Sequence, residues 1–405
     1  MERFLFALKK FIPRPAFVFF QPAYHFTLAF LAAVYYGFSA RGGSVLGRPS
    51  RSLKVIGITG TSGKTTTAEM LFKIFSEAGF KTATLNGLYF RILGETEQNL
   101  FKMTMPGRFF VQKFLHDAKK AGCEYVFLEV TSEGIKQFRH KFIKFYAAIF
   151  TNLSEEHLEA HGGFENYRGA KGELFKIAPL AILNGDDANF EYFYKLSPRE
   201  KIVYVAADFP QGLELKIPGE FNKMNAMSAL TFAKREGISP EIAKKALENI
   251  EVLPGRMEYL ATDRGFKVLV DYAFLPQTLK LAYEDAKRKS SGLVCVLGAT
   301  GGGRDRWKRP LTGEVAAQYC RKVFVTNEDP YDEDPLKIMN EVAGTHNFEK
   351  ILDRREGIRA ALKAARAGEC VVITGKGAEP WIMGPGGTKT AWDDRRIVRE
   401  ELAKL

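Results

Sequence analysis

Short apolar runs alternate with amphipathic stretches along the first half of the chain. The first clear run is Lys54–Thr59 (KVIGIT), and a glycine-rich turn leads from it into a helical pattern from Thr65 to Ala78. Further apolar runs follow, separated by stretches long enough for helical crossovers: Tyr125–Val130, Ala147–Thr151 and Ala181–Asn184. We therefore predict an α/β fold with a mostly parallel, doubly wound sheet.

A second series of apolar runs begins after Leu253–Gly255 (LPG). Its members are Lys267–Tyr272, Gly292–Gly298, Lys322–Thr326 and Glu369–Thr374. Each is followed by a helical or loop region, which predicts a second, smaller, Rossmann-like α/β domain. We expect a short N-terminal segment and two domains that face each other across a cleft, with boundaries at 1–50, 51–253 and 254–405.

The N-terminal segment is apolar, aromatic and basic. Its apolar runs are interrupted by charged residues, prolines and polar residues, namely Lys9, Lys10, Pro13, Arg14, Pro15, Gln21, Pro22 and His25. Neither a cleaved signal peptide nor a membrane-spanning helix is therefore favoured. Residues 1–45 either cover the next domain, which is the commoner fate of apolar helices, or lie on a membrane. We expect a cytoplasmic protein with at most a peripheral contact to the inner face of the membrane.

Composition places the chain among soluble globular proteins. It has 405 residues, of which 46% are hydrophobic and 26% are charged. A net charge of +12 could suggest nucleic acid, but residues 1–54 carry eight Lys and Arg against the single acid Glu2 and so account for +7 of it. This excess suits an anionic substrate or a membrane equally well. Because no RNA-binding or DNA-reading motif is present, we predict no nucleic-acid partner.

The four cysteines are scattered singly along the chain: Cys123, Cys295, Cys320 and Cys370. No C-x-x-C pair could build a zinc site or a redox centre. We expect reduced, buried, structural thiols.

Candidate chemistry begins at the turn after the first strand, which reads Gly60-Thr61-Ser62-Gly63-Lys64-Thr65. Backbone N–H groups of such a loop and the following helix N-terminus can cradle phosphates. Lys64 would reach the β- and γ-phosphates, and Thr65 a Mg²⁺ ion. Ile58 stands where the strict spacing has glycine, so the loop is a variant. A purely structural turn is the alternative, but the strand–loop–helix context favours a nucleotide site.

With ten further blocks, this loop resembles the Mur ligase family, which builds the peptide of bacterial peptidoglycan. The blocks are EVTSEG (Glu129–Gly134), TNLSEEHLEAHG (Thr151–Gly162), ENYRGAKGELF (Glu165–Phe175), FNKMNA (Phe221–Ala226), LPGRME (Leu253–Glu258), VDYA (Val270–Ala273), GGGRDRWKRP (Gly301–Pro310), NEDPYDEDP (Asn327–Pro335), GKGAE (Gly375–Glu379) and WDDR (Trp392–Arg395). Within the family, the sequence is most similar to the members that add the third amino acid. The resemblance implies an ATP-dependent, ADP-forming ligase that joins an amino acid to a muramoyl-peptide carboxylate.

The implied reaction can also be argued from its chemistry. A carboxylate at neutral pH lacks a leaving group, and transfer of the γ-phosphoryl group of ATP would supply one as an acyl-phosphate. An amine then attacks this acyl-phosphate to form the amide. Phosphoryl transfer between two anions depends on cations and positioning, for which Lys64, Mg²⁺ and Arg256 would serve.

By resemblance, two Mg²⁺ ions are held by Thr65, Glu129, His157 and Lys171. Glu129 ends a buried strand beside the phosphate loop, although helix capping is its alternative. Lys171 matches a lysine that is usually carbamylated in this family, with a solvated helix lysine as the alternative. Nucleotide contacts are expected from Gly60, Thr61, Ser62, Gly63, Lys64, Thr65, Thr66, Asn222, Asn225, Arg256 and Asp271. Asn222 and Asn225 could equally cap a helix.

The substrate residues fall into two groups. Thr104, Ser132 and Arg139 resemble part of the muramoyl-peptide site. The free amino acid is expected to meet Arg304, Arg306, Glu328, Asp329, Tyr331, Gly375 and Glu379. Members that add diaminopimelate have an arginine where Tyr331 stands, and acids surround Tyr331 here. The resemblance therefore predicts a basic amino acid such as lysine or ornithine, while Asp332 and Asp334 are expected to be solvated or to cap a helix.

The sequence departs from the family in several places. Only 59 residues precede Gly60, and they contain no recognisable version of the domain that grips UDP. The acceptor could therefore be carried on UDP, on a lipid or on a polymer. Phe274 and Ala378 replace histidines of the family blocks. Folylpolyglutamate and cyanophycin synthetases are weaker matches, and the intact Lys64, Glu129, His157 and Lys171 argue against a non-catalytic nucleotide-binding scaffold.

Overall fold

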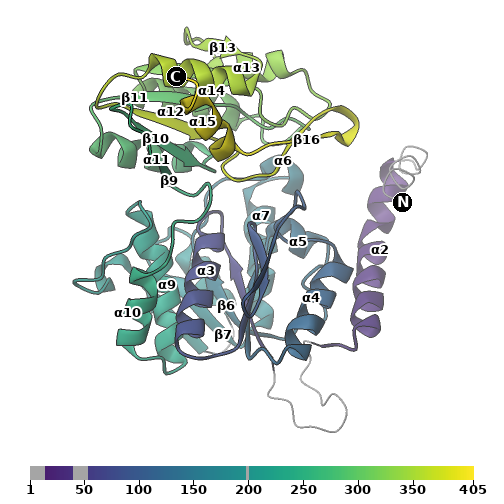
Figure 1. Cartoon of the computed structure of the whole chain (residues 1–405). Helices are drawn as coiled ribbons and strands as arrows, with labels where there is room; N and C mark the ends of the chain where they lie inside the picture. The colour runs from purple at the N-terminus through teal and green to yellow at the C-terminus, as the bar shows by residue number, and fades with distance from the viewer. Residues whose placement is uncertain (1–13, 40–52, 198–199) are drawn as a thin grey trace. The chain divides into compact units, whose positions relative to one another are not determined.

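The structure is a computed structural model that describes residues 14–39, 53–197 and 200–405, with side chains from residue 20 onward (Figure 1). The chain divides into two compact units. Unit 1 comprises the described residues of Met1–Leu153, Arg168–Val205 and Ser228–Ala243. Unit 2 comprises Ser154–Tyr167, Ala206–Met227 and Lys244–Leu405.

Unit 1 is built on an eight-stranded sheet of order β4-β3-β2-β5-β1-β6-β7-β8. The strands are β1 (Lys54–Thr59), β2 (Thr82–Leu85), β3 (Tyr89–Ile92), β4 (Glu95–Gln98), β5 (Tyr125–Glu129), β6 (Phe145–Phe150), β7 (Leu180–Asn184) and β8 (Glu200–Tyr204). The six strands from β2 to β8 in this order pair in parallel, whereas β3 and β4 add an antiparallel edge. The predicted mostly parallel sheet is confirmed.

Helices follow the strands of this sheet, as the apolar pattern predicted. They are α3 (Lys64–Glu77), α4 (Arg108–Lys120), α5 (Ser132–Lys136), α7 (Phe164–Ile177), α8 (Phe190–Leu196), α9 (Phe221–Arg235) and α10 (Pro240–Glu248), of which α7, α9 and α10 cross the boundary between the units. The central strand β1 carries Val55, Ile56 and Ile58 fully buried. A continuous apolar run of this kind is typical of a parallel strand that is covered on both faces.

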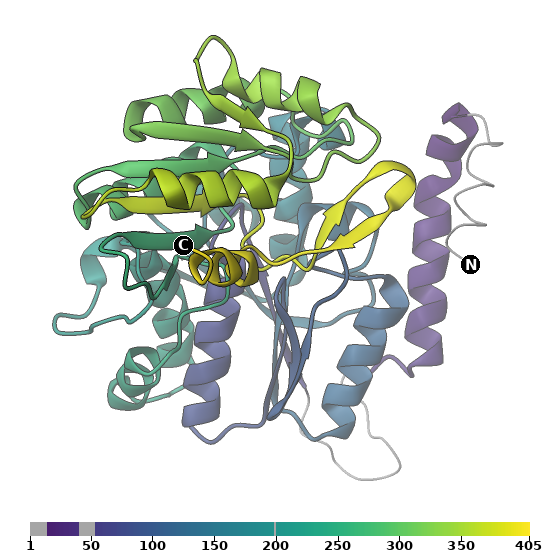
Figure 2. The ribbon, with the colours of Figure 1, turned by 45° about the horizontal axis from the view of Figure 1, so that its top comes forward.

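The N-terminal helix α2 (Arg14–Tyr35) lies beside α4 in both views (Figures 1 and 2). Ala29, Ala32 and Ala33 are its buried residues, because small side chains allow the two helices to approach closely. The predicted helical segment is therefore present over the described part. Residues 1–13 and 40–45 of that prediction lie outside the described residues. Within the described ranges, no helix is both long and apolar enough to cross a membrane.

Unit 2 contains a six-stranded sheet of order β13-β12-β11-β14-β10-β9, parallel except for β9. Its strands are β9 (Glu258–Leu260), β10 (Lys267–Asp271), β11 (Leu293–Leu297), β12 (Lys322–Thr326), β13 (Glu349–Ile351) and β14 (Cys370–Thr374). A separate hairpin is formed by β15 (Trp381–Met383) and β16 (Lys389–Ala391).

Helices cover both faces of the unit 2 sheet, which gives two separate cores. One core contains Leu279 of α11 (Pro276–Arg288), Ala316 of α12 (Lys308–Tyr319) and Ile338 of α13 (Pro335–Ala343). The other contains Ile358 of α14 (Arg354–Ala364) and Ile397 of α15 (Asp394–Leu402). The short elements are α6 (Leu158–His161), η1 (Ala206–Asp208) and η2 (Pro385–Gly387). This three-layer arrangement confirms the predicted Rossmann-like fold.

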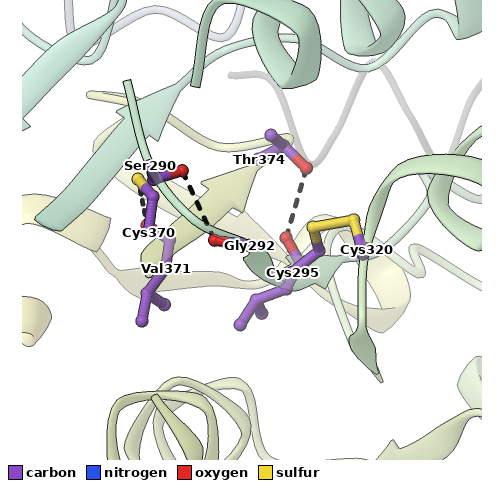
Figure 3. The surroundings of a disulfide bond; sticks show 8 residues. Ser290, Gly292, Cys295, Cys320, Cys370, Val371 and Thr374 are labelled. Atoms are coloured by element: carbon purple, nitrogen blue, oxygen red, sulfur yellow. Dashed lines mark hydrogen bonds between the residues drawn. A yellow bond between two sulfur atoms is a disulfide. The ribbon is translucent and has the colours of Figure 1, made fainter. Parts of the chain in front are cut away.

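A disulfide joins Cys295 on β11 to Cys320 at the end of α12 (Figure 3). The expectation of reduced thiols is wrong for this pair, because the crossover from β11 to α12 returns Cys320 to the strand that carries Cys295. The other two thiols, Cys123 and Cys370, are free and buried as expected. Burial raises the pKa of Cys123 to about 11 and that of Cys370 to about 12, so both remain protonated at neutral pH.

Candidate functional site

The phosphate loop between β1 and α3 has a backbone that only glycine allows at two points. Gly60 has a φ of 156°, and a Cβ atom there would lie 1.9 Å from Thr151 Oγ1. Gly63 has a φ of 79° and precedes the first turn of α3. Glycine adopts this left-handed region without the strain that a Cβ atom imposes. The loop therefore needs both glycines for its shape.

The segment after β6 holds this loop in place. The Thr61 N–H donates to the Asn152 carbonyl at 2.8 Å, and the Ser62 N–H donates to Asn152 Oδ1 at 3.0 Å. Thr151 Oγ1 donates to the Ser62 carbonyl at 2.7 Å. Asn152 was not predicted as a functional residue, although it lies in the block TNLSEEHLEAHG. Its side chain fixes the loop that carries Lys64.

Two lysines donate to the Gly60 carbonyl, Lys64 Nζ at 3.0 Å and Lys171 Nζ at 2.6 Å. Lys64 Nζ also donates to the Thr61 carbonyl at 2.8 Å, so its side chain curls over the loop. Lys171 is only 2% exposed, which rules out the alternative of a solvated helix lysine. The structure thus brings both predicted lysines to the phosphate loop.

Oxygen atoms of three predicted residues surround Gly87, the residue that follows β2 and Asn86. A Cβ atom on Gly87 would lie 3.3 Å from Thr65 Oγ1, 3.5 Å from Thr104 Oγ1 and 3.7 Å from Glu129 Oε2. Thr65 Oγ1 donates to Glu129 Oε2 at 2.8 Å, and Lys64 Nζ lies 3.8 Å from Glu129 Oε1. Hydroxyl and carboxylate oxygens are the ligands that Mg²⁺ prefers. This donor set therefore fits the predicted metal, and Gly87 is a residue that sequence reasoning missed.

The capping alternative for Glu129 is wrong. Thr131 is the residue that caps α5, since its side chain accepts the Gly134 N–H at 3.0 Å. The Glu129 carboxylate instead accepts the Gly87 N–H at 3.0 Å and the Thr65 hydroxyl. The carboxylate is therefore directed toward the phosphate loop and away from the helix end.

The predicted acceptor residue Arg139 is buried beside the segment that carries Thr104. Its guanidinium donates to the Met105 carbonyl, to Met103 Sδ at 3.3 Å and to Gln137 Oε1 at 2.7 Å. Burial, together with nearby Arg108, lowers its pKa to about 10. Arg139 therefore holds the chain on both sides of Thr104.

The third predicted acceptor residue, Ser132, is the buried first residue of α5. This short helix packs on Met105, whose Sδ would lie 2.5 Å from a Cβ atom on Gly134. Met105 thus links Ser132 to the corner that contains Thr104 and Arg139. Thr66, a predicted nucleotide contact, is buried in the first turn of α3.

In unit 2, the predicted adenine contacts Asn222 and Asn225 lie on the first turn of α9 and are buried. Asn222 Nδ2 donates to the Pro218 carbonyl at 2.6 Å, and Asn225 Nδ2 donates to Asn222 Oδ1 at 2.8 Å. The two side chains therefore stabilise the entry into the helix, as their structural alternative requires. Their contact with adenine stays a prediction.

Asp271 and Arg256 lie at one end of β10. The Asp271 carboxylate accepts the Met257 N–H at 2.6 Å and the Ala273 N–H at 2.8 Å, and burial raises its pKa. The guanidinium of Arg256 stacks over the ring of Tyr272 at 4.0 Å. Asp271 thus fixes the turn that presents Arg256, while its predicted ribose contact stays a prediction.

Two carboxylates share the buried ammonium of Lys376 near the ends of β12 and β14. Lys376 Nζ donates to the Asp329 carboxylate at 2.9 and 3.0 Å and to Glu379 Oε2 at 2.6 Å. Burial alone would lower the pKa of Lys376, but Glu379 and Asp329 raise it, so the side chain stays charged. Glu379 Oε1 accepts the Tyr272 hydroxyl at 3.1 Å. Lys376 and Tyr272 were not singled out from the sequence, although both lie in the matching blocks GKGAE and VDYA.

Glu328 is the third carboxylate of this cluster. Its Oε1 accepts the Thr300 hydroxyl at 2.9 Å, whereas its Oε2 has no hydrogen-bond partner among the described residues. A Cβ atom on Gly375 would lie 2.1 Å from that Oε2, so the glycine leaves room for it. Burial raises the pKa of Glu328. A buried acid without a full set of partners favours a ligand that brings a donor.

The two predicted arginines of the amino-acid site are exposed. The Arg304 guanidinium lies 5.3 Å from the ring centre of Tyr331, and Arg306 Nη2 lies 3.1 Å from Glu333. Between them, Asp305 accepts the backbone N–H groups of His157 at 2.8 Å and Leu158 at 2.9 Å. The predicted metal ligand His157 is therefore tied to the loop that carries both arginines.

Three residues of these loops have a strained backbone. His157, Asp305 and Tyr331 have φ values of 55°, 42° and 52°, in the region that favours glycine. Such strain is typical of functional loops that the surrounding structure holds in place. The expected structural role is confirmed for Asp334, which caps α13. Asp332 accepts the Gly386 N–H at 2.7 Å.

The predicted site residues therefore form two groups. In unit 1, Lys64, Thr65, Thr104, Glu129 and Lys171 gather around the phosphate loop. The unit 2 group consists of Arg256, Asp271, Glu328, Asp329, Gly375 and Glu379. His157 belongs to unit 2, so the predicted metal ligands are divided between the units.

A phosphate loop on a mostly parallel sheet, followed in the chain by a Rossmann-like unit, defines the class of P-loop ATP-dependent ligases. The family description "Mur ligase middle domain" matches residues 58–212, and "Mur ligase, glutamate ligase domain" matches residues 255–377. The chain belongs to the Mur ligase family. It is an ATP-dependent acid–amino-acid ligase that forms ADP.

Individual relatives agree with this assignment. The UDP-N-acetylmuramoyl-L-alanyl-D-glutamate--2,6-diaminopimelate ligase of Syntrophomonas wolfei is 35% identical over 93% of this chain and 81% of the relative. The UDP-N-acetylmuramyl-tripeptide synthetase of a Roseiflexus species is 33% identical over 93% of this chain and 82% of the relative. A solved UDP-N-acetylmuramoyl-L-alanyl-D-glutamate--2,6-diaminopimelate ligase superposes with a TM-score of 0.57 at 28% identity, over 87% of this chain and 78% of that one.

Proposed function

We propose that this ligase adds a basic amino acid to the carboxylate of a muramoyl peptide, through an acyl-phosphate, during synthesis of peptidoglycan precursors. The observation that carries the proposal is the space beside Gly87, where the phosphate-loop residue Thr65, the carboxylate of Glu129 and the acceptor-site residue Thr104 converge. A carboxylate bound near Thr104 would lie beside the phosphates that the loop holds. This proximity is what phosphoryl transfer requires.

Each residue of unit 1 then has a defined task. The N–H groups of the first turn of α3 bind phosphate oxygens, since those of Thr61 and Ser62 are bonded to Asn152. Lys64 leaves the Gly60 and Thr61 carbonyls to neutralise the charge that develops on the γ-phosphoryl group. Thr65 and Glu129 would hold one Mg²⁺ ion, which supplies positive charge to the phosphates when bound. Arg139 keeps the segment around Thr104 in position for the acceptor.

A carbamate on Lys171 is part of the proposal. The lysine is buried, and its Nζ atom lies 2.6 Å from the Gly60 carbonyl, so the amine is held at the edge of the phosphate loop. The ammonium first loses a proton, and the resulting neutral amine reacts with CO₂ to give a carbamate and a second proton, so that a cation becomes an anion. The carbamate would supply an anionic ligand for a second Mg²⁺ ion.

The charge balance of unit 2 supports a basic amino acid. Lys376 is bonded to both Asp329 and Glu379, and the nearby Arg354 is bonded to Asp394. These two cations therefore face four carboxylates including Glu328, whose Oε2 has no hydrogen-bond partner among the described residues. A substrate ammonium would offset this excess of negative charge. Tyr331 stands where an arginine of diaminopimelate-adding members would bind the distal carboxylate. The names of several relatives specify diaminopimelate, so this amino acid is the direct competitor.

Two assays test the proposal. Amino-acid-dependent phosphate release is measured with UDP-linked and lipid-linked muramoyl dipeptides side by side. If neither acceptor supports phosphate release, the proposed role in peptidoglycan precursor synthesis is refuted. Values of kcat/KM are then compared for lysine, ornithine, diaminopimelate and alanine. An unpaired buried charge is worth about 2–5 kcal/mol, so lysine should exceed diaminopimelate by roughly 30-fold or more. A preference for diaminopimelate would refute the proposal that this acidic pocket selects a basic amino acid.

A further inference from the structure

Helix α2 exposes an unusual share of large apolar side chains. Among the described residues, seven of the twenty exposed large apolar side chains belong to this one helix: Phe20, Tyr24, Phe26, Phe30, Leu31, Val34 and Tyr35. Phe20 is 63% exposed and Tyr35 is 75% exposed. Apolar side chains gathered in this way are typical of a surface that binds a partner.

The spacing of these residues gives the helix two distinct faces. Phe20, Tyr24, Leu31 and Tyr35 follow each other at helical spacing along one side, whereas Ala29, Ala32 and Ala33 occupy the side that is buried. The stripe continues beyond the helix, since the ring of Tyr35 lies 6.4 Å from that of Phe109 on α4, which is also exposed. The exposed stripe is therefore a surface and not a set of isolated side chains.

The amino-acid sequence that contains this helix indicates an anionic partner. Residues 1–54 carry eight Lys and Arg against one Glu, and Arg14 is the only charged residue in α2. Aromatic side chains combined with basic residues suit the headgroup region of a membrane. A second copy of the chain would carry the same excess of positive charge in this part of its sequence, and repulsion between like charges opposes self-association. An anionic lipid surface offers both apolar depth and opposite charge.

The inner side of α2 contacts the predicted acceptor corner of unit 1. The ring of Phe26 packs on Phe138 and Phe142, and His25 contacts the guanidinium of Arg108. Arg108 Nε donates to the Gln137 carbonyl at 3.0 Å, and the Gln137 side chain accepts from Arg139. Arg108 and Gln137 therefore connect α2 to Arg139.

We propose that the exposed stripe of α2 docks unit 1 onto an anionic membrane surface and holds its acceptor corner there, so that the acceptor is a muramoyl peptide carried on a lipid. The second part rests on the proposed ligase function, whereas docking does not. The helix lies in the plane of the interface with its aromatic side chains among the headgroups and acyl chains. Alanines and rings on its other side keep it attached to α4 and to residues 138–142.

Vesicle co-sedimentation of the full chain tests the docking. The probes are phosphatidylcholine vesicles with and without phosphatidylglycerol. The wild type should bind the anionic vesicles, and raised salt should weaken this binding. A Tyr24→Ser, Leu31→Ser, Tyr35→Ser variant should lose binding by about tenfold or more. The matched control is Leu311→Ser, Leu336→Ser, Leu352→Ser, which changes equally exposed apolar residues of unit 2 and should bind as the wild type does.

Several outcomes would overturn the inference. They are absence of wild-type binding, equal binding by the α2 variant, or a dimer that the α2 variant abolishes while vesicles are not bound. Thermal melting of each variant verifies that it folds. Phosphate release then separates the two proposals, since the α2 variant should keep its rate with a UDP-linked acceptor and lose it with a vesicle-embedded one. Inactivity with every acceptor would refute the ligase proposal and leave docking intact.

Discussion

Two lysine side chains share one acceptor at the phosphate loop, the carbonyl of Gly60. The two differ in their surroundings, because Lys64 is partly accessible and Lys171 is buried. An accessible ammonium can move from the loop carbonyls onto a phosphate. A buried amine at a fixed position is better suited to become a metal ligand. Substitutions at these two positions should therefore fail in different ways.

Lys64→Ala should lower kcat by about 10²–10³-fold or more, because it removes the cation that offsets charge on the transferred phosphoryl group. Its melting temperature should stay near that of the wild type, since Lys64 donates hydrogen bonds to carbonyls of its own loop and makes only a long ion pair, of 3.8 Å, with Glu129. Lys73→Ala, on the same helix, is the matched control and should retain activity. ATP-dependent ligation at the wild-type rate in Lys64→Ala would remove the phosphate loop from the mechanism.

Lys171→Ala should be inactive but partly rescued by small carboxylates such as acetate or formate, which would replace the anionic carbamate. The wild type should lose activity in CO₂-depleted buffer and regain it when bicarbonate is added. Measuring the ligation rate over a series of bicarbonate concentrations tests this dependence. Full activity without CO₂ would show that the lysine acts as an amine.

At the scale of elements, the fit between two loops of unit 2 depends on a single glycine. Gly255, before Arg256, has a φ of 61°, and a Cβ atom there would lie 2.2 Å from the Ala378 backbone nitrogen. Gly265 also has a positive φ, of 74°, but its Cβ atom would be in ordinary contact at 3.7 Å. Both positions would strain the backbone of a non-glycine residue, but only at Gly255 would the added Cβ atom also clash with a neighbouring segment.

Gly255→Ala should therefore lower the free energy of unfolding by about 1–3 kcal/mol more than Gly265→Ala does. Because it displaces the loop that carries Lys376 and Glu379, it should also raise the KM for the amino acid. Urea denaturation and steady-state kinetics of both variants measure these effects. Equal losses in the free energy of unfolding would mean that the strain of a positive φ, and not the close approach of the two loops, explains the effect of both substitutions.

The disulfide of unit 2 is a second feature at this scale. It closes a loop between β11 and the end of α12 with a sequence separation of 25. Cross-links of this size restrict the unfolded chain and contribute about 3 kcal/mol in the loop-entropy account. A reductant should lower the melting temperature of the wild type and leave that of Cys320→Ser unchanged. The same shift in both proteins would exclude the bond as its cause.

The strands that the sequence predicted were the apolar ones. Each of the predicted runs from Lys54 to Thr374 forms a strand within two residues of its expected bounds. The missed strands are short or lack a continuous apolar run. For example, β4 (ETEQ) is exposed at every position and is held by pairing with β3. Its formation depends on a neighbour and not on its own pattern.

The candidate site also contains residues that a local pattern predicts and residues whose roles depend on distant segments. Lys64, Thr65 and Glu129 were predictable because strand, loop and helix are local features of the sequence. Gly87 and Asn152 were not, because their roles arise from contacts with segments far away in the chain. Cys295 and Cys320 belong to the same class, since only the fold brings them together.

For the whole molecule, the net charge of +12 arises unevenly. Residues 1–54 contribute +7 of it, while unit 2 contains a cluster in which Lys376 is bonded to Asp329 and Glu379, with Glu328 close by. The protein therefore combines a basic N-terminal region with a local excess of negative charge in its Rossmann-like unit. Each is suited to a partner of the opposite sign.

In the proposed amino-acid site, Glu328 would couple binding to the release of a proton. Burial raises its pKa, so as pH falls the free protein takes up a proton on this carboxyl group before an exposed glutamate does. An arriving ammonium would lower that pKa, and the proton would leave. Affinity for lysine should therefore increase as pH rises through the raised pKa. In calorimetry near that pH, the heat of binding should depend on the ionisation enthalpy of the buffer, and Glu328→Gln should remove the dependence. Identical wild-type heats in two buffers would contradict this proton release.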